Sequence, residues 1–128
     1  MNSSAVIKVK ATNLALTPAI EEYVQKKVGM LEKFAEHFSR ESGRLLYEVE
    51  VEKITAHHKY GDVFRAEINF SAGSTFLRAE AEAGDLYAAI DAVKDELQGE
   101  LRKHKSKEQT IFKRGGTKLK ELFRRFYE

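Results

Sequence analysis

The stretch VFRAEINFSAGSTFLRAEAEA, residues 63–83, decides the fold class of this chain. Apolar and polar side chains alternate in residues 63–71 and again in residues 76–83, which is the period of a half-buried β-strand. The AGST between these runs is typical of a tight turn, so the stretch predicts a β-hairpin with one buried face. The buried side chains are expected to be Phe64, Ala66, Ile68 and Phe70 on the first strand and Leu77, Ala79, Ala81 and Ala83 on the second.

Two further runs with the same period lie upstream of the hairpin. Residues 45–54, LLYEVEVEKI, alternate strictly, with glutamates on one side and with the apolar side chains of Leu45, Tyr47, Val49 and Val51 on the other. Residues 5–12, AVIKVKAT, alternate between small or branched apolar side chains and lysines. Together these runs predict two more strands.

Two stretches have the period of an amphipathic helix. Residues 16–38, LTPAIEEYVQKKVGMLEKFAEHF, begin with Thr17 as a good N-cap and Pro18 at the first helical position. They predict one helix with a buried stripe at Ile20, Val24, Val28, Leu31, Ala35 and Phe38. A second helix is expected after a cap at Asp85, with its buried stripe at Leu86, Ile90, Val93, Leu97 and Leu101.

The element order β-α-β-β-β-α predicts an α+β fold with a four-stranded sheet. Because a strand–helix–strand unit prefers a right-handed crossover, both helices are expected to pack on one face of the sheet. The other face would be open to water, and its side chains are Glu48, Glu50, Glu52, Arg65, Glu67, Arg78, Glu80 and Glu82, with Phe76 the one aromatic residue among them. This acidic face would repel phosphates, so cross-strand Glu–Arg pairs on a plain soluble surface are the better interpretation.

Length and composition indicate a single small domain. The chain has 128 residues, of which 42% are hydrophobic and 33% charged, and we expect one core domain over residues 1–108. Residues 109–128 are expected to be a basic tail that is flexible or forms a short amphipathic helix. The absence of cysteine excludes disulfides and thiolate–metal sites and fits a cytoplasmic protein. No apolar run reaches the ~20 residues of a membrane span, so no membrane partner is expected.

Positive charge is concentrated towards the C-terminal end. The chain holds 22 Lys and Arg against 20 Asp and Glu, whereas residues 101–128 hold ten against three. This polarity favours a polyanionic partner, and a solvated basic tail is the alternative. The dipole of the second helix would by itself favour two or three cations in the last helical turn.

Basic side chains on the two predicted helices could frame a groove for phosphates. The candidate contacts are Lys26, Lys27, Lys33, Tyr87, Lys94, Arg102, Lys103, Lys105, Lys107, Lys113 and Arg114. Lys27 lies close to the buried stripe of its helix, where its stem can lie along apolar surface while its amine reaches outward. Tyr87 either contacts the ligand or is a half-buried structural tyrosine.

No pattern in the sequence indicates an enzyme. His57 and His58 form the only histidine pair and have no third ligand at a suitable spacing, so no metal site is expected. KRGGTK lacks the spacing of a phosphate-binding P-loop. No carboxylate, Ser or Thr has the surroundings that acid–base or nucleophilic catalysis requires. We therefore expect no cofactor and no small-molecule substrate.

The stretch FRAEINFSAGSTFLRAEAEAGDLYAAIDAVKDELQGELRKHK, residues 64–105, resembles the ribosome hibernation promoting factor and ribosome-associated inhibitor family, also described as sigma-54 modulation proteins. LTPAIEEYVQKKVGMLEKF, residues 16–34, is similar to the first helix of that family. The DLYAAID segment and the closing LRKHK are the most specific part. The resemblance covers residues 5–107 and indicates a short member without the separate C-terminal domain of long members.

This resemblance implies a fold like a double-stranded-RNA-binding domain with an extra first strand. It implies binding to 16S rRNA of the small subunit, alone and within the 70S ribosome, in the mRNA and tRNA channel near the decoding centre. Translation would then be blocked under stress or in stationary phase. Basic positions of the family match Lys27, Lys33, Arg102, Lys103 and Lys105, whereas Glu96 and Gly99 stand where the family is commonly basic.

Two other functions remain open from the residues alone. A general double-stranded-RNA-binding module would use the same topology and the same basic helices. A protein–protein adaptor would instead dock the apolar side of the tail into a partner, through Leu119, Leu122, Phe123 and Phe126. In each case we expect the free protein to be a monomer.

Overall fold

The computed structural model of the chain describes residues 5–54 and 61–105. The elements are β1 (Ala5–Thr12), α1 (Pro18–Gly29), α2 (Glu32–Ser42), β2 (Leu45–Ile54), β3 (Val63–Ala72), β4 (Thr75–Ala83) and a helix over residues 86–105, called here the C-terminal helix. Several predicted features lie outside the described residues: His57 and His58, the candidates Lys107, Lys113 and Arg114, and the tail 109–128 with its four apolar positions.

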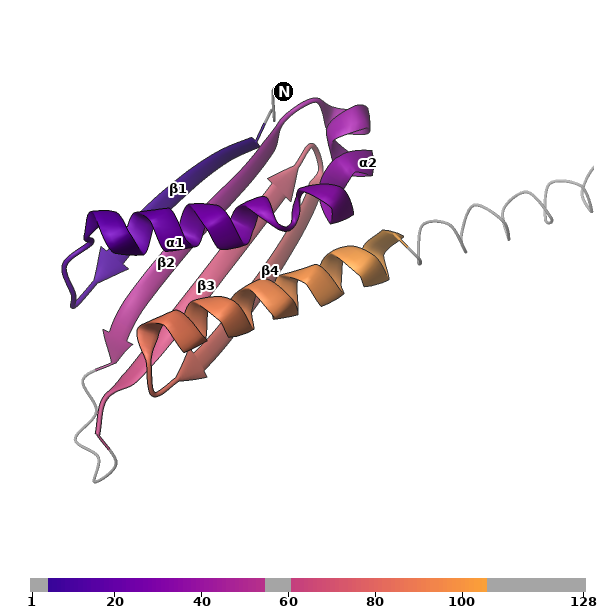
Figure 1. Cartoon of the computed structure of the whole chain (residues 1–128). Helices are drawn as coiled ribbons and strands as arrows, with labels where there is room; N and C mark the ends of the chain where they lie inside the picture. Colours follow the sequence, from indigo (N-terminus) through magenta and orange to yellow (C-terminus); the bar gives the residue numbers. More distant parts are fainter. Residues whose placement is uncertain (1–4, 55–60, 106–128) are drawn as a thin grey trace, which may run out of the picture.

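The strands form one sheet in the order β1-β2-β3-β4 (Figure 1). β1 pairs with β2 in parallel, and the other two pairs are antiparallel. The register places inward side chains opposite inward side chains, as in Tyr47 opposite Phe70 and Val49 opposite Ile68. The helices lie on one face of this sheet, so the predicted α+β fold is confirmed.

The β3–β4 hairpin has the tight turn that the sequence indicated. Ala72 pairs with Thr75, which leaves Gly73 and Ser74 as the two turn residues. Gly73 has a φ of 59°, a conformation that glycine adopts without steric cost. A glycine in the first position of a two-residue loop matches the strand twist of a hairpin.

The core lies between the sheet and the helices. The whole predicted stripe of the first helical region is buried, from Ile20 to Phe38, and so is the stripe of the C-terminal helix, from Leu86 to Leu101. Aromatic rings meet at its centre, where Phe70 lies 5.1 Å from Tyr47 and 5.3 Å from Phe38 between ring centroids. Burial of each large apolar side chain stabilises the fold by about 1.5–3 kcal/mol.

The single helix predicted over residues 16–38 is in fact two helices. The α1 helix ends at Gly29, and the backbone N–H groups of Met30 and Leu31 bond to carbonyls three residues back, at 3.2 and 2.9 Å. Glycine has low helix propensity, and such tight bonds are typical of a helix end. Leu31 nevertheless stays fully buried, because the turn keeps the apolar stripe directed at the sheet.

The α1 helix and the C-terminal helix begin with the predicted caps. The Thr17 hydroxyl accepts a hydrogen bond from the Ile20 N–H at 3.2 Å, and Pro18 occupies the first turn of α1. The Asp85 carboxylate accepts from the Ala88 N–H at 3.0 Å. These bonds satisfy backbone donors that have no partner within the helix.

Candidate nucleic-acid interface

The C-terminal helix (orange) runs beside α1 in Figure 1, and the line of side-chain contacts between it and the α1–α2 region is called here the helix seam. Tyr23 and Lys27 of α1 contact Tyr87 and Asp91, and Phe34 of α2 contacts Arg102 further along. Since higher residue numbers on one side meet higher numbers on the other, the two sides run in the same direction. The seam brings together four predicted residues: Lys27, Lys33, Tyr87 and Arg102.

One end of the seam is the Asp91 cluster, which consists of Tyr23, Lys27, Tyr87 and Asp91. The Tyr23 hydroxyl donates to Asp91 Oδ1 at 2.6 Å, and Lys27 Nζ lies 3.0 Å from the same oxygen. The Lys27 ammonium also lies 5.3 Å from the centroid of the Tyr23 ring, and the Tyr87 ring meets that ring edge-on at 4.8 Å. The positive charge of Lys27 is thus matched by a negative charge within the protein.

Hydrogen bonding shifts the proton affinities in this cluster. The hydrogen bond from Tyr23, followed by the contact with Lys27, holds the pKa of Asp91 below its usual range. The hydrogen bond to Asp91 raises the pKa of Lys27 and likewise raises the pKa of Tyr23. All three shifts favour a carboxylate, an ammonium ion and a neutral phenol at neutral pH.

The other end of the seam is the Phe34 cluster, which consists of Lys33, Phe34 and Arg102. Lys33 Nζ lies 5.1 Å and Arg102 Cζ 4.9 Å from the centroid of the Phe34 ring, within the range of cation–π contacts. Both cations are exposed, and within residues 5–54 and 61–105 neither forms an ion pair. This end therefore presents two available positive charges beside an aromatic ring.

The other described candidates lie outside these clusters. Lys94 is largely buried along its stem, pairs with Asp95 at 3.0 Å and donates to Gln98 at 3.2 Å. Lys103 lies 3.9 Å from Glu100 one turn earlier. Lys26 and Lys105 are exposed and form no ion pair with any residue that the structure describes. The predicted cations thus differ in how much of their charge remains available.

Sequence reasoning missed Phe34 and Asp91 as members of this surface and gave Tyr23 no role in it. Tyr23 and Lys27 are four residues apart, as are Tyr87 and Asp91, so each pair could have been placed on one helix face. The sequence predicted that the two helices frame a groove, but it did not indicate which residues of the two faces make contact. Phe34 lies next to the buried stripe and could have been taken for an ordinary core residue.

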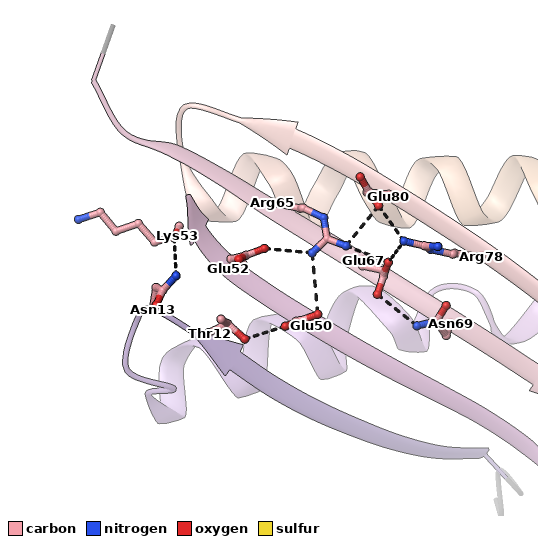
Figure 2. A network of polar contacts seen from close by, with 10 residues as sticks. All are labelled: Thr12, Asn13, Glu50, Glu52, Lys53, Arg65, Glu67, Asn69, Arg78 and Glu80. Atoms are coloured by element: carbon pink, nitrogen blue, oxygen red, sulfur yellow. Dashed lines mark hydrogen bonds and ion pairs between the residues drawn. The ribbon is translucent and has the colours of Figure 1, made fainter. Parts of the chain in front are cut away.

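The open face of the sheet carries the predicted cross-strand Glu–Arg pairs (Figure 2). Arg65 lies within 3.8 Å of Glu50, 3.1 Å of Glu52, 2.9 Å of Glu67 and 3.2 Å of Glu80. Arg78 pairs with Glu67 and with Glu80. The Arg65 guanidinium holds the pKa of Glu80 below its usual range. Because acids outnumber bases here, this face does not suit a phosphate backbone.

Neither a metal-binding cluster nor a membrane-spanning helix is present in the described part of the chain. No group of three or more His, Asp or Glu side chains there is arranged to hold a metal ion. None of the helices in residues 5–54 and 61–105 has the length and apolar character needed to cross a membrane.

The fold and the seam define a class of protein: a small α+β domain with a cationic, aromatic helical surface opposite an acidic sheet. The family model described as "Sigma 54 modulation protein / S30EA ribosomal protein" matches residues 7–109. The chain belongs to this family, as its sequence resemblance indicated.

Curated relatives agree with this assignment. A ribosome hibernation promotion factor of Picosynechococcus is 34% identical over 102 residues, which are 77% of this chain and 48% of that protein. The factor of Bacillus subtilis is 27% identical over 110 residues, or 85% of this chain and 53% of that protein. The chain thus spans about half the length of these two relatives. A ribosome hibernation promoting factor of Klebsiella oxytoca is 31% identical, and 94% of its length is covered. None of these names describes an enzyme, in agreement with the expectation of a non-catalytic protein.

Solved structures support the fold. The N-terminal domain of Protein Y from Thermus thermophilus matches with a TM-score of 0.61 and 31% identity, over 76% of this chain and 94% of that domain. A ribosomal subunit interface protein from Coxiella burnetii matches with a TM-score of 0.60 at 19% identity, which shows a shared fold. The expected likeness to a double-stranded-RNA-binding domain stays a prediction.

Proposed function

We propose that this chain is a ribosome hibernation factor that binds the small ribosomal subunit and blocks translation under stress or in stationary phase. It would act in the cytoplasm, as a monomer when free, on 16S rRNA in the mRNA and tRNA channel near the decoding centre. The family and the names of the relatives support ribosome association. The observation that carries the proposal is the Phe34 cluster, where Lys33 and Arg102 flank an aromatic ring.

The Phe34 cluster has the chemistry that folded RNA requires. Lys33 and Arg102 can neutralise phosphates and release condensed counterions, which is the main source of affinity for nucleic acids. Unpaired bases stack on aromatic rings and on planar guanidinium groups. The acidic open face of the sheet would point away from rRNA, so the two faces together would orient the protein. Occupation of the channel would exclude mRNA and tRNA by steric hindrance.

The proposal is tested by co-sedimentation of the purified protein with 30S, 50S and 70S particles at several salt concentrations. We expect comigration with 30S and 70S but not with 50S, and steep loss of binding as salt rises. Absence of binding to 30S at low salt would overturn the proposal.

A charge-removal pair then tests the surface. Lys33→Gln with Arg102→Gln removes the two available charges of the Phe34 cluster and should greatly weaken comigration. Lys8→Gln with Lys10→Gln removes the same charge from exposed positions on β1, and it should leave comigration near that of the parent. Equal losses in both variants would show that net charge, and not this surface, accounts for binding.

A general double-stranded-RNA-binding module is the second candidate, because the same two cations would serve it. An unrelated A-form duplex distinguishes the two: a general module would bind it as tightly as 30S, whereas a hibernation factor would prefer the subunit.

The adaptor hypothesis depends on residues 109–128, which lie outside the described residues. Deletion of residues 109–128 should abolish function in an adaptor and only weaken or redirect it in a ribosome factor.

A further inference from the structure

We propose that Asp91 determines specificity: its carboxylate disfavours an arbitrary phosphate backbone and accepts a hydrogen bond from a donor group on the correct RNA site. The proposal rests on the function proposed above. The donor would be a 2′-hydroxyl or a base amino group, since both can pair with a carboxylate and a phosphate cannot.

The contacts of Asp91 occupy the donors that a phosphate would need. One carboxylate oxygen, Oδ1, receives both the Tyr23 hydroxyl at 2.6 Å and Lys27 Nζ at 3.0 Å. A phosphate that approaches Lys27 must compete with this oxygen and is repelled by its charge. Lys27 therefore contributes little net attraction for phosphates, although it lies on the predicted basic surface.

The second oxygen of Asp91 can face a ligand. The Asp91 side chain is 45% exposed, whereas that of Lys27 is 21% exposed. No hydrogen bond or ion pair engages Oδ2 within the described residues. A partly exposed carboxylate with one such oxygen is an acceptor for a polar RNA group, and a charged acceptor forms a strong hydrogen bond.

The seam is thereby divided into two parts that select different RNA groups. The Phe34 cluster, with Lys33 and Arg102, attracts phosphates. The Asp91 cluster offers phosphates little net attraction and accepts donors. An RNA must present both groups at the spacing of the two clusters, which a folded rRNA site can do and a random segment rarely does. Repulsion of the wrong partner is a general source of specificity.

The test compares Asp91→Asn with Asp62→Asn. The asparagine introduced by Asp91→Asn would keep the shape and an acceptor for Tyr23 but would lose the charge that holds Lys27. Asp62 pairs with Lys53 at 3.5 Å, and neither residue belongs to the Asp91 cluster or the Phe34 cluster, so its replacement makes the same charge change elsewhere. Binding of each full-length variant to 30S and to an unrelated RNA duplex is measured as a function of salt.

We expect Asp91→Asn to bind the unrelated duplex about two- to fivefold more tightly than Asp62→Asn does. Its logarithmic salt slope for the duplex should be steeper by about 0.7–0.9, as for one more neutralised phosphate. Its preference for 30S over duplex should fall. Asp91→Glu, which keeps the charge, should retain the slope and the preference of the parent.

The opposite results would overturn the proposal. One such result is that Asp91→Asn binds the duplex no more tightly than Asp62→Asn does. The other is that the salt slope of duplex binding is unchanged in Asp91→Asn. If circular dichroism shows that Asp91→Asn does not fold, the role of Asp91 is tested with Asp91→Glu and Lys27→Gln instead. Lys27→Gln leaves the Asp91 charge unmatched and should weaken duplex binding, while an unchanged affinity would refute the role of Asp91. Loss of 30S binding by the parent would refute the proposed function, and the duplex comparison would still decide the role of Asp91.

Discussion

At the scale of single residues, Phe34 is the side chain whose role is hardest to see in the sequence. It is half-buried and contacts two cations that come from different elements, Lys33 of α2 and Arg102 of the C-terminal helix. Its neighbours Leu31 and Ala35 are fully buried. The ring thus forms the edge of the core and part of the helix seam at the same time.

We predict that Phe34→Leu weakens 30S binding about fivefold or more, because stacking of a base on an aromatic ring contributes ~1–3 kcal/mol. Leucine keeps an apolar side chain at the core edge, so the fold should persist. Co-sedimentation or fluorescence anisotropy provides the dissociation constant. Phe76→Leu is the matched control, since Phe76 is 60% exposed on the acidic sheet face. Equal effects at Phe34 and Phe76 would contradict the prediction.

The Asp91 cluster should make stability depend on pH in a defined direction. The folded pKa of Asp91 is lowered, first by the hydrogen bond from Tyr23. Its contribution to the free energy of unfolding is therefore fully present above the unfolded value of about 3.9, and it is lost as pH falls through the lower folded pKa. Lys27 and Tyr23 have raised pKa values, so their contributions are lost only as pH rises beyond about 10.

Urea unfolding of the parent and Asp91→Asn between pH 2 and 7 measures this dependence. The parent should be the more stable at neutral pH, and the difference should shrink towards acid pH. The cluster is solvent-exposed, so the difference will be modest. A difference that stays constant down to pH 2 would show that the charge of Asp91 has no part in it.

At the scale of elements, Gly99 and Gly43 show how the effect of a glycine depends on its place in a helix. Gly99 lies inside the C-terminal helix, and a Cβ built there meets nothing within 4 Å. Gly43 ends α2 with a φ of 78° and has equally open surroundings. The two sites therefore differ in backbone conformation and not in available space.

We predict that Gly99→Ala stabilises the protein by about 0.5–1 kcal/mol, because alanine has the higher helix propensity and restricts the unfolded chain. Gly43→Ala should destabilise it by about 1 kcal/mol, because a Cβ is disfavoured in the left-handed region. Urea denaturation of both variants provides the comparison. Changes of the same sign would be inconsistent with this account.

The division between α1 and α2 is an element-scale feature of the described residues that periodicity did not predict. The apolar positions from Ile20 to Phe38 continue through Gly29 without interruption. Periodicity records which side of the chain is buried, and that side stays the same across the turn at Met30. The turn matters for the site because Lys33 and Phe34 lie directly after it.

At the scale of the whole molecule, opposite faces carry opposite charge characters. On the open face of the sheet, ion pairs of Arg65 and Arg78 with glutamates link neighbouring strands (Figure 2). The helices of the seam lie on the other side of the sheet (Figure 1), and the seam presents the cations Lys33 and Arg102. Stability and RNA binding should therefore respond to different substitutions.

We predict that Arg65→Met lowers the free energy of unfolding by about 1–3 kcal/mol without a change in 30S binding. The Arg65 side chain is only 17% exposed and serves four glutamates, including the largely buried Glu67, which would lose a charged hydrogen-bond donor. Arg78 is 55% exposed, so Arg78→Met should cost less. Urea unfolding and co-sedimentation provide the two readouts. Reduced 30S binding by folded Arg65→Met would place RNA contacts on the sheet.

The sequence by itself determined the strands, the hairpin turn, both helix caps, the buried stripes and the acidic sheet face, since each depends on local period or on residues a few positions apart. It also indicated the family and the cations on the helices. Only the tertiary structure decided which of these cations form ion pairs within the described residues. Tyr23 and Asp91 are 68 positions apart, and Phe34 meets Arg102 only where the two sides of the seam pack. Charge pairing depends on distance in space, which helix packing sets and sequence period does not record.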